Sequence, residues 1–401
     1  MASESLPPEL LEIVIGFIDD CKTLKASAVV CHTFCVPAQK RLFTSFTLLP
    51  SSLPGTSVAP PQGLDAFLAK ATHIASYVRC LTVVCPHSNN WVGAILPHFV
   101  LFTRLTSLVV DCREYSLRDA SITWQYFHTE TLEALRALAA LPSMHTLELY
   151  SADLSIALQL LPPQQPPPVL RHLALYNAQF NADIPLALDS PDAEQQNLTR
   201  FNLESLELHP NPLRELSDPI FARFVNLARL RHVHLTFPLS IYEAYAAQVQ
   251  VLQHAVELEH LQLTYLGFDT STDPRVLDIG HLSKLHTIEL TIDIDANVVS
   301  PTLYSVVEMV ICCIDIPSPV QHVIIGLALA EPPNFPELTR SLTHFVGRLV
   351  PLCRSWVDRS FTPTLLFRIY MNESEQHLRN AVWDEVKELG MDVSIEVLSG
   401  Q

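Results

Sequence analysis

A short apolar pattern, L-x-x-L-x-L with other aliphatic residues at some positions, recurs along most of this chain of 401 residues. Its copies lie mostly 26 to 28 residues apart, and three longer intervals indicate insertions. Alternation of apolar and polar residues predicts strands with one buried face. The nine copies are VRCLTV, LTSLVV, MHTLEL, LRHLAL, LESLEL, LRHVHL, LEHLQL, LHTIEL and VQHVII, whose fourth positions are Leu81, Leu108, Leu147, Leu173, Leu206, Val233, Leu261, Ile288 and Val323.

Helical patterns, with apolar residues three and four positions apart, separate several of these strands. They cover Thr131–Leu141, Ile241–Glu257, Leu303–Ile314, Leu338–Cys353 and Glu375–Leu389. Two further strand candidates, Leu365–Met371 and Val393–Leu398, follow near the C-terminal end. Strand, turn and helix repeated at this spacing predict an α/β fold: a right-handed solenoid with a parallel concave sheet and convex helices. A doubly wound α/β domain is the alternative, but ten glycines and no G-x-G-x-x-G give it little support.

The period and the strand signature resemble the leucine-rich repeat, whose units are 20–29 residues long. That family usually carries Asn or Cys three residues after the last Leu of the motif, where the side chain satisfies backbone groups of the turn. Only Asn211 fits that position here. We therefore expect the turns to satisfy their backbone groups in another way.

The N-terminal segment 6–43 is apolar around most of its first helical pattern, from Leu10 to Ile18. So short a segment rarely stands alone, and apolar residues on more than one face predict burial against the chain and against a partner. A helical cap that merely closes the solenoid is the alternative. Its L-P-P-E-L-L start, V-C-H-T-F middle and L-F end resemble the F-box, with His32 and Phe34 as small departures.

The F-box resemblance implies docking to a Skp-type adaptor, which links F-box proteins to a cullin in SCF ubiquitin ligases. The resemblance covers about a tenth of the chain and predicts three parts: an F-box at 1–48, a Pro-rich linker at 49–63, and an irregular solenoid with a C-terminal α/β cap at 64–401. The residues expected to bind the adaptor are Leu6, Pro7, Leu10, Leu11, Val14, Ile18, Leu24, Val30, Phe34, Leu42 and Phe43.

Composition narrows the function further. A net charge of −17 argues against general binding of nucleic acid or anionic membranes, which requires clustered Lys and Arg. No apolar run reaches the ~18 residues of a membrane span. The nine cysteines follow no pairing framework, and the acidic start MASES is unlike a secretory signal. We expect reduced thiols and a location in the cytoplasm, the nucleus or both.

Motifs for catalysis or metal binding are missing: there is no P-loop, H-E-x-x-H, G-x-S-x-G or paired Cys-x-x-Cys. Cys31-His32-x-x-Cys35 lies within the F-box pattern and reads as core cysteines beside an incidental histidine. The sequence therefore predicts no catalytic residue, no metal and no cofactor.

The third, fifth and seventh positions of each repeat are predicted to point to the concave face. Aromatic, histidine and carboxylate side chains there suit recognition of a protein segment. A merely solvated face, with binding at loop edges or the C-terminal end, is the alternative, and a pH-sensitive histidine row is a further option. The residues expected to bind a target are Glu148, Tyr150, Tyr176, Glu207, His209, His234, Gln262 and Glu289, and the third positions include His172, His232, His260 and His322.

Two functions remain open at this stage. The first is a non-catalytic substrate-recognition subunit of an SCF ubiquitin ligase, which binds the adaptor and, through its repeats, a target protein. The second is an adaptor-binding scaffold with no role in ubiquitination.

Overall fold

The computed structural model describes residues 7–48, 61–84, 98–112, 129–151, 170–176, 201–209, 225–238, 251–266, 279–294, 319–329, 363–371 and 392–399, with isolated residues at 347, 351, 354 and 383. The chain divides into two compact units, Met1–Phe201 and Asn202–Gln401. Twelve strands and a few helices make up the described part, so the fold is α/β. In this part no helix combines the length and the apolar character that crossing a membrane requires.

Three short helices open the first unit: α1 (Pro8–Gly16), α2 (Cys21–Val30) and α3 (His32–Leu42). Helix α3 packs against both of the others, and a small core of Ile15, Leu24 and Ala38 holds the three together. Asp20 caps α2, because its side chain accepts a hydrogen bond of 2.7 Å from the backbone N–H of Thr23. We call α1, α2 and α3 the helical module.

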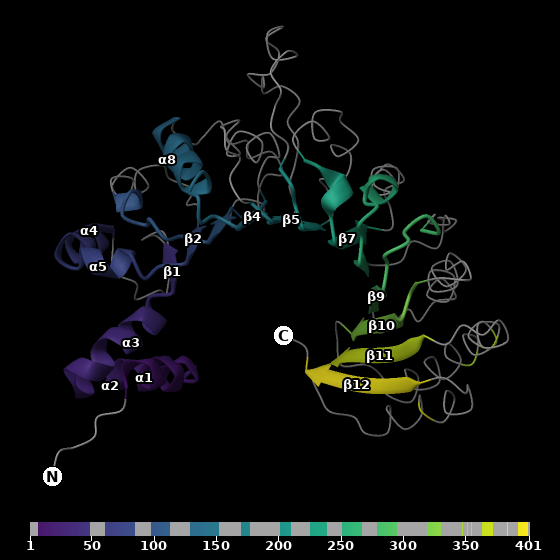
Figure 1. The fold of residues 1–401 in the computed structure, drawn as a ribbon, viewed down its shortest axis with the longest axis horizontal. Coiled ribbons are helices and arrows are strands. Elements are labelled where there is room, and N and C mark those ends of the chain that lie inside the picture. Colours follow the sequence, from purple (N-terminus) through teal and green to yellow (C-terminus); the bar gives the residue numbers. More distant parts are fainter. Residues whose placement is uncertain are drawn as a thin grey trace, which may run out of the picture. The chain divides into compact units, whose positions relative to one another are not determined.

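Five parallel strands follow in the first unit and lie side by side in chain order (Figure 1). They are β1 (Ser45–Leu48), β2 (Cys80–Val84), β3 (Ser107–Asp111), β4 (Thr146–Tyr150) and β5 (His172–Tyr176). Three helices lie between them in the chain: α4 (Pro61–Lys70), α5 (Thr72–Ala75) and α8 (Thr129–Ala139). Leu135 and Leu138 of α8 are buried, as expected of a helix that covers one face of a sheet.

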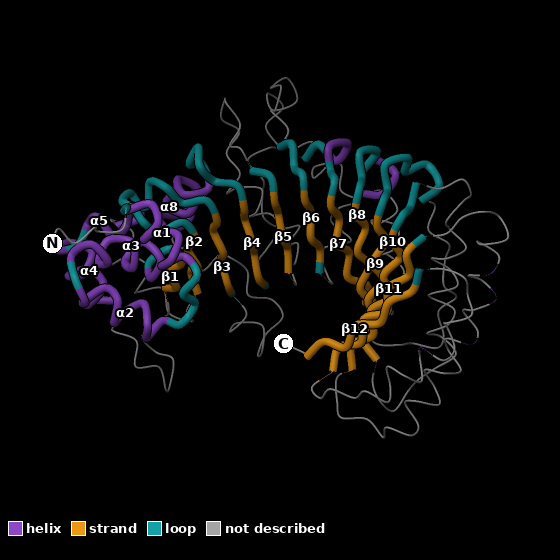
Figure 2. The backbone as a smooth tube through the Cα atoms, turned by 60° about the horizontal axis from the view of Figure 1, so that its bottom comes forward, coloured by secondary structure: helices purple, strands orange, loops and turns teal. Residues whose placement is uncertain are grey.

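The second unit contains seven parallel strands, again in chain order (Figure 2). They are β6 (Ser205–Leu208), β7 (His232–Pro238), β8 (His260–Leu266), β9 (Thr287–Ile294), β10 (His322–Leu329), β11 (Thr364–Met371) and β12 (Val393–Ser399). A single 3-10 turn, η3 (Leu227–Arg229), lies before β7 in the described residues.

Burial alternates along the strands with the period of the repeat. In β4, Leu147 and Leu149 are fully buried, whereas Thr146, Glu148 and Tyr150 are only partly covered. The same alternation in β2, β3 and β6 assigns the fourth and sixth positions of each repeat to the core. The remaining side chains, at the third, fifth and seventh positions, form what we call the sheet face.

Backbone hydrogen bonds join successive repeats at the point where each strand begins. The N–H groups of Arg79 and Cys80 both donate to the carbonyl oxygen of Thr44, at 2.8 and 3.0 Å. The carbonyl of Arg79 in turn accepts from Thr106 and Ser107. In other repeats, too, one carbonyl oxygen accepts from two successive N–H groups. These acceptors belong to His145, Glu204, Arg231, Glu259 and His286. We call this series of bonds the main-chain ladder; it aligns the strand starts, whereas most of the turn positions expected to carry asparagine lie outside the described residues.

The structure confirms the eleven predicted strands and their parallel arrangement within each unit. It also confirms the helix predicted at Thr131–Leu141, as α8. Strand β1 was not predicted, although it continues the sheet directly from the helical module. The other four predicted helices lie wholly or largely outside the described residues, as does Asn211.

Candidate functional site

The eight residues predicted to bind a target all lie on the sheet face and are all partly exposed. They divide between the two units. Glu148, Tyr150 and Tyr176 belong to the first unit, where the two tyrosine rings stack at a centroid distance of 4.1 Å and an angle of 1°. The hydroxyl of Tyr150 also lies 3.3 Å from Oε2 of Glu148, so these three side chains form one group.

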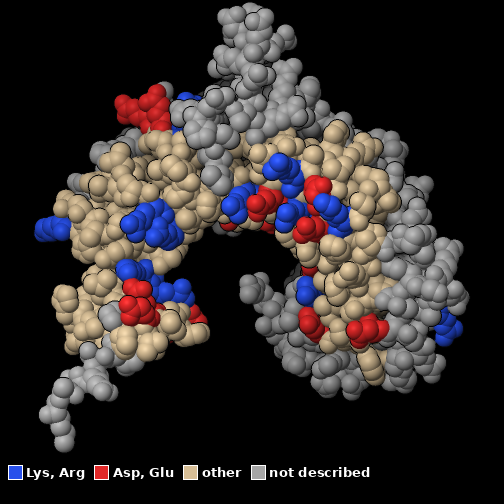
Figure 3. Space-filling view, viewed as in Figure 1, with Lys and Arg blue, Asp and Glu red and all other residues tan. Residues whose placement is uncertain are grey.

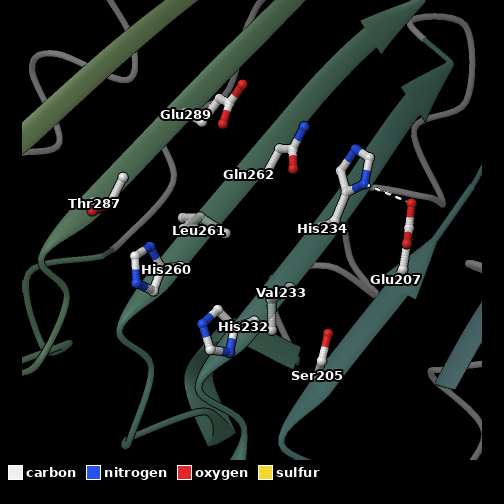
Figure 4. Close-up of a pocket in the computed structure, with 10 residues that line it drawn as sticks. All are labelled: Ser205, Glu207, His232, Val233, His234, His260, Leu261, Gln262, Thr287 and Glu289. Atoms are coloured by element: carbon white, nitrogen blue, oxygen red, sulfur yellow. Dashed lines mark hydrogen bonds and ion pairs between the residues drawn. The ribbon is translucent and has the colours of Figure 1, made fainter. Parts of the chain in front are cut away.

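The other five predicted residues belong to the second unit, where the sheet face is hollowed. The hollow has a volume of about 470 Å³ and crosses β6, β7, β8 and β9. The polar side chains drawn in Figure 4 project toward the same side of the four strands, whereas Val233 and Leu261 are buried. Its lining consists of Ser205, Glu207, His232, Val233, His234, His260, Leu261, Gln262, Thr287 and Glu289.

Charged side chains of both signs lie close together on the second unit around β7 (Figure 3). Nε of Arg231 lies 3.8 Å from Oε1 of Glu259, and Lys284 pairs with Glu257. These pairs are at the strand starts, beside the hollow. A ligand of the hollow therefore meets hydrogen-bonding groups and mixed charge, which favours a polar partner over a purely apolar one.

Glu207, His209 and His234 form a hydrogen-bonded cluster at one end of the hollow. Oε1 of Glu207 lies 2.9 Å from Nε2 of His209 and 2.9 Å from Nδ1 of His234. The far nitrogen of each ring has a hydroxyl partner: Thr236 is 3.1 Å from Nδ1 of His209, and Thr264 is 2.9 Å from Nε2 of His234. The cluster is a chain of five side chains from three neighbouring repeats.

The carboxyl of Glu207 stays ionised in this cluster. Burial is the largest single influence on its pKa and acts to raise it, but hydrogen bonds from His209 and His234, with their charge, together outweigh burial. The pKa of Glu207 is therefore lowered well below its ordinary value. A permanently charged carboxylate is thus held at one end of the hollow.

Two more histidines stack on the other side of the hollow. The rings of His232 and His260 are 4.8 Å apart at an angle of 9°. Burial, and after it the charge of His232, lower the pKa of His260, while Glu259 acts in the opposite direction. His286 and His322 contribute smaller effects that also lower it.

Acidification is expected to weaken the folded state partly through His260. A histidine whose pKa is lowered by folding binds more protons in the unfolded chain, so its contribution to stability is present above the unfolded pKa of about 6.5 and is lost below it. The thermal midpoint of the wild type should therefore fall slightly more between about pH 7.5 and pH 5.5 than that of His260→Gln. His172→Gln, at the same repeat position in the first unit, is the control. Equal pH dependence of all three chains would contradict this assignment.

Arg368 on β11 connects three strands of the sheet face. Its Nη1 lies 3.2 Å from Oε1 of Glu289 on β9, and its Nε lies 3.1 Å from Oε2 of Glu396 on β12. Gly326 of β10 is in register between Thr291 of β9 and Arg368. Because glycine has no side chain, the guanidinium can cross β10 at this point and reach Glu289.

Removing this bridge should cost a measurable amount of stability. A double-mutant cycle of Arg368→Ala and Glu289→Ala is expected to give a coupling free energy of about 0.5–1 kcal/mol, the upper range for partly exposed pairs. The pair of Lys284 and Glu257, whose side chains are more exposed, is the matched control and should give a smaller value. A coupling no larger than that of the control, measured by chemical denaturation, would show that the bridge adds nothing.

The helical module presents a second candidate surface. Leu10, Ile13, Val14 and Phe17 are spaced three and four residues apart along α1 and are all exposed, Phe17 to 82%. We call these four residues the apolar stripe. Val29 at the end of α2 is exposed to 83% and Val30 to 70%. Seven of the ten large exposed apolar side chains in the described residues lie between positions 10 and 36.

The predicted adaptor-binding residues differ in how exposed their side chains are. Leu10, Val14 and Val30 are exposed, and so is Pro7, which precedes α1. Leu11 and Leu24 are buried in the chain, so they support the module from inside and leave no side-chain surface for a partner. Between these groups are the partly buried residues Ile18, Phe34, Leu42 and Phe43, while Leu6 lies outside the described residues.

Sequence reasoning missed several members of both surfaces. The helical spacing alone is enough to place Ile13 and Phe17 on the same side of α1 as Leu10 and Val14. Thr236 and Thr264 sit at the seventh position of their repeats, and Arg368 takes the corresponding position in β11. Extending the repeat register to the seventh position of every strand would have identified these three.

Comparison with known proteins adds little. No protein-family model matches the chain, and no curated protein matches it in sequence. Among solved structures it is similar to the crystal structure of a protein from Bacteroides fragilis, with a TM-score of 0.30 and 13% identity over 82% of this chain and 67% of that one. This similarity is too weak to indicate a function.

Proposed function

We propose that the chain is a non-catalytic substrate-recognition subunit of an SCF-type ubiquitin ligase. In this proposal the helical module is an F-box that binds a Skp-type adaptor, and through it a cullin. The strands belong to leucine-rich repeats, and their sheet face binds a target protein. The observation that carries the proposal is the apolar stripe on a module whose own core is already filled.

The apolar stripe supports docking because exposure of apolar side chains to water is unfavourable, and a bound partner would cover them. Leu11 and Ile15 of the same helix already face the module's interior, so α1 has an inner apolar side and an outer one. Large apolar side chains grouped on an outer surface are typical of protein interaction sites. The F-box resemblance of segment 6–43 makes a Skp-type adaptor the expected occupant.

The hollow of the second unit supports target binding. It combines stacked imidazoles, an amide from Gln262 and two carboxylates, Glu207 on β6 and Glu289 on β9. Such a surface can hydrogen-bond a polar or basic segment of a protein. Ubiquitin transfer belongs to other subunits in this scheme, so recognition is the whole task of the sheet face.

Co-expression of the tagged full chain with a Skp-type adaptor and a cullin tests the proposal. Co-purification of both with the wild-type chain is expected. A target should accumulate on chains whose apolar stripe is replaced, because such chains bind it without delivering it for ubiquitination. Adaptor without cullin, or no accumulation of a bound protein, would favour a scaffold with no role in ubiquitination. Absence of the adaptor itself would reject the F-box assignment.

Filling the hollow should prevent target capture. Gln262→Arg with Thr287→Arg places two long cationic side chains inside it, and we expect captured protein to fall at least tenfold through bulk and charge. The matched control is Gln253→Arg with Ser283→Arg, which adds the same charge at exposed positions that do not line the hollow. Quantitative mass spectrometry of co-purified proteins provides the measurement. Equal loss in both chains would place recognition elsewhere.

A further inference from the structure

We propose that Glu207, His209 and His234 bind one divalent transition-metal ion of the zinc type. This site shares Glu207 and His234 with the hollow proposed to bind a target, but it does not depend on that proposal. Glu207 lies on β6, His209 directly follows that strand and His234 lies on the adjacent strand β7, and one ligand atom from each lies within 4.8 Å of the others. Two imidazoles and one carboxylate are a donor set that Zn²⁺ uses, and three protein ligands leave a further position for water or for a donor atom of a bound molecule.

The distances suit an ion of this size. Both histidine nitrogens converge on the same carboxylate oxygen at 2.9 Å. In a tetrahedral zinc site, bonds of about 2.0–2.2 Å place ligand atoms roughly 3.3–3.5 Å apart. To admit an ion, the nitrogens have to withdraw from Oε1 by about half an ångström and approach each other from a separation of up to 4.8 Å, which requires rotation of the two side chains.

The partners of the far nitrogens orient the two rings. Histidine ligands of metals usually hydrogen-bond through their second nitrogen to a fixed group, which sets both tautomer and ring direction. Thr236, which is fully buried, takes this position for His209, and Thr264 takes it for His234. A hydroxyl can donate or accept, so each threonine suits the ring before and after a metal replaces the hydrogen bond to Glu207.

Charge also favours a cation at this point. Glu207 supplies a carboxylate oxygen, and imidazoles coordinate a metal through lone pairs in their neutral form. Glu289 lies at the same fifth repeat position two strands beyond His234 and lines the same hollow. Because Arg368 already pairs with Glu289, the carboxylate that attracts a divalent ion is chiefly that of Glu207, and the purely hydrogen-bonded cluster is the metal-free state.

Metal titration of the full chain tests the site. After removal of metals by EDTA and its exchange out of the buffer, the wild type should bind one equivalent of Zn²⁺ more than Glu207→Gln or His234→Gln, whose affinity at this site should fall at least about 100-fold. His232→Gln is the control, since it removes a histidine of the same strand from the hollow. The chain has 17 histidines and nine cysteines, and comparing matched variants cancels their background binding.

Two further measurements keep the test decisive. Co²⁺ should give the wild type, but not His234→Gln, the visible absorption of a four-coordinate ion. Thr264→Val, which leaves all three ligands in place, should weaken binding about 10–100-fold. Far-ultraviolet circular dichroism in EDTA verifies that the variants fold. Equal zinc stoichiometry and affinity in the wild type and His234→Gln, or equal loss in His232→Gln, would overturn the proposal.

Discussion

Replacement of Leu10, Val14 and Phe17 together by glutamine is expected to abolish co-purification of the chain with a Skp-type adaptor. The three side chains are exposed in the free chain, and docking would remove them from water. Burying what is exposed of them is worth about 3–6 kcal/mol in total. Losing it should weaken binding about 10²–10⁴-fold. Glutamine is a good helix former, so α1 should persist.

Two single substitutions, compared with each other, provide the control for this experiment. Val14 and Val256 are exposed to 52% and 49%, but only Val14 lies in the apolar stripe. Val14→Gln should weaken adaptor binding, whereas Val256→Gln should leave it unchanged, as measured by isothermal titration. If the triple variant still co-purifies with the adaptor at wild-type yield, the apolar stripe is not the docking surface.

Leu24→Ala should unfold the helical module while the sheet remains intact. Leu24 is buried in the small core that it forms with Ile15 and Ala38, and truncating a buried leucine costs about 2–5 kcal/mol. A core this small has little stability to lose. Limited proteolysis should therefore cut within residues 8–42 in Leu24→Ala and spare them in the wild type.

Val29→Ala is the matched comparison on the same helix. Val29 is exposed, so its truncation should change stability by less than about 0.5 kcal/mol. The two variants distinguish a buried residue that supports the fold from an exposed one that contacts a partner. Leu24→Ala is expected to lose any adaptor binding because its module unfolds, whereas a loss in Val29→Ala would come from the surface. Proteolysis of Leu24→Ala at the wild-type rate would mean that α2 is held by something other than this core.

The strands were predictable because the repeated pattern shows which positions of each strand are buried. Leucines at the fourth and sixth positions recur in enough copies that the buried face is evident without any structure. Strand β1 escaped prediction because its four residues follow an apolar helical segment directly, and Phe46 and Leu48 alone carry the pattern. Only its pairing with β2 identifies it as part of the sheet.

The candidate sites were predictable in part. The predicted target-binding residues do share the sheet face, because alternation fixes side-chain direction in a strand. In α1, apolar residues occupy most of the circumference, so sequence alone did not separate outward Leu10 and Val14 from inward Leu11. Contacts such as Glu207 with His234 join residues in different repeats, and no local motif signals them.

The main-chain ladder at the strand starts has a consequence for how this chain tolerates change. Its donors and acceptors are present in every residue except proline, which lacks the N–H. Substitution of Arg79, Thr106 or His145 by any residue except proline therefore leaves these hydrogen bonds between repeats intact. Selection at those positions is free to act on other properties. Repeats joined in this way can diverge in turn sequence and in length, as the long intervals before β4 and before β10 do, while their strands stay paired.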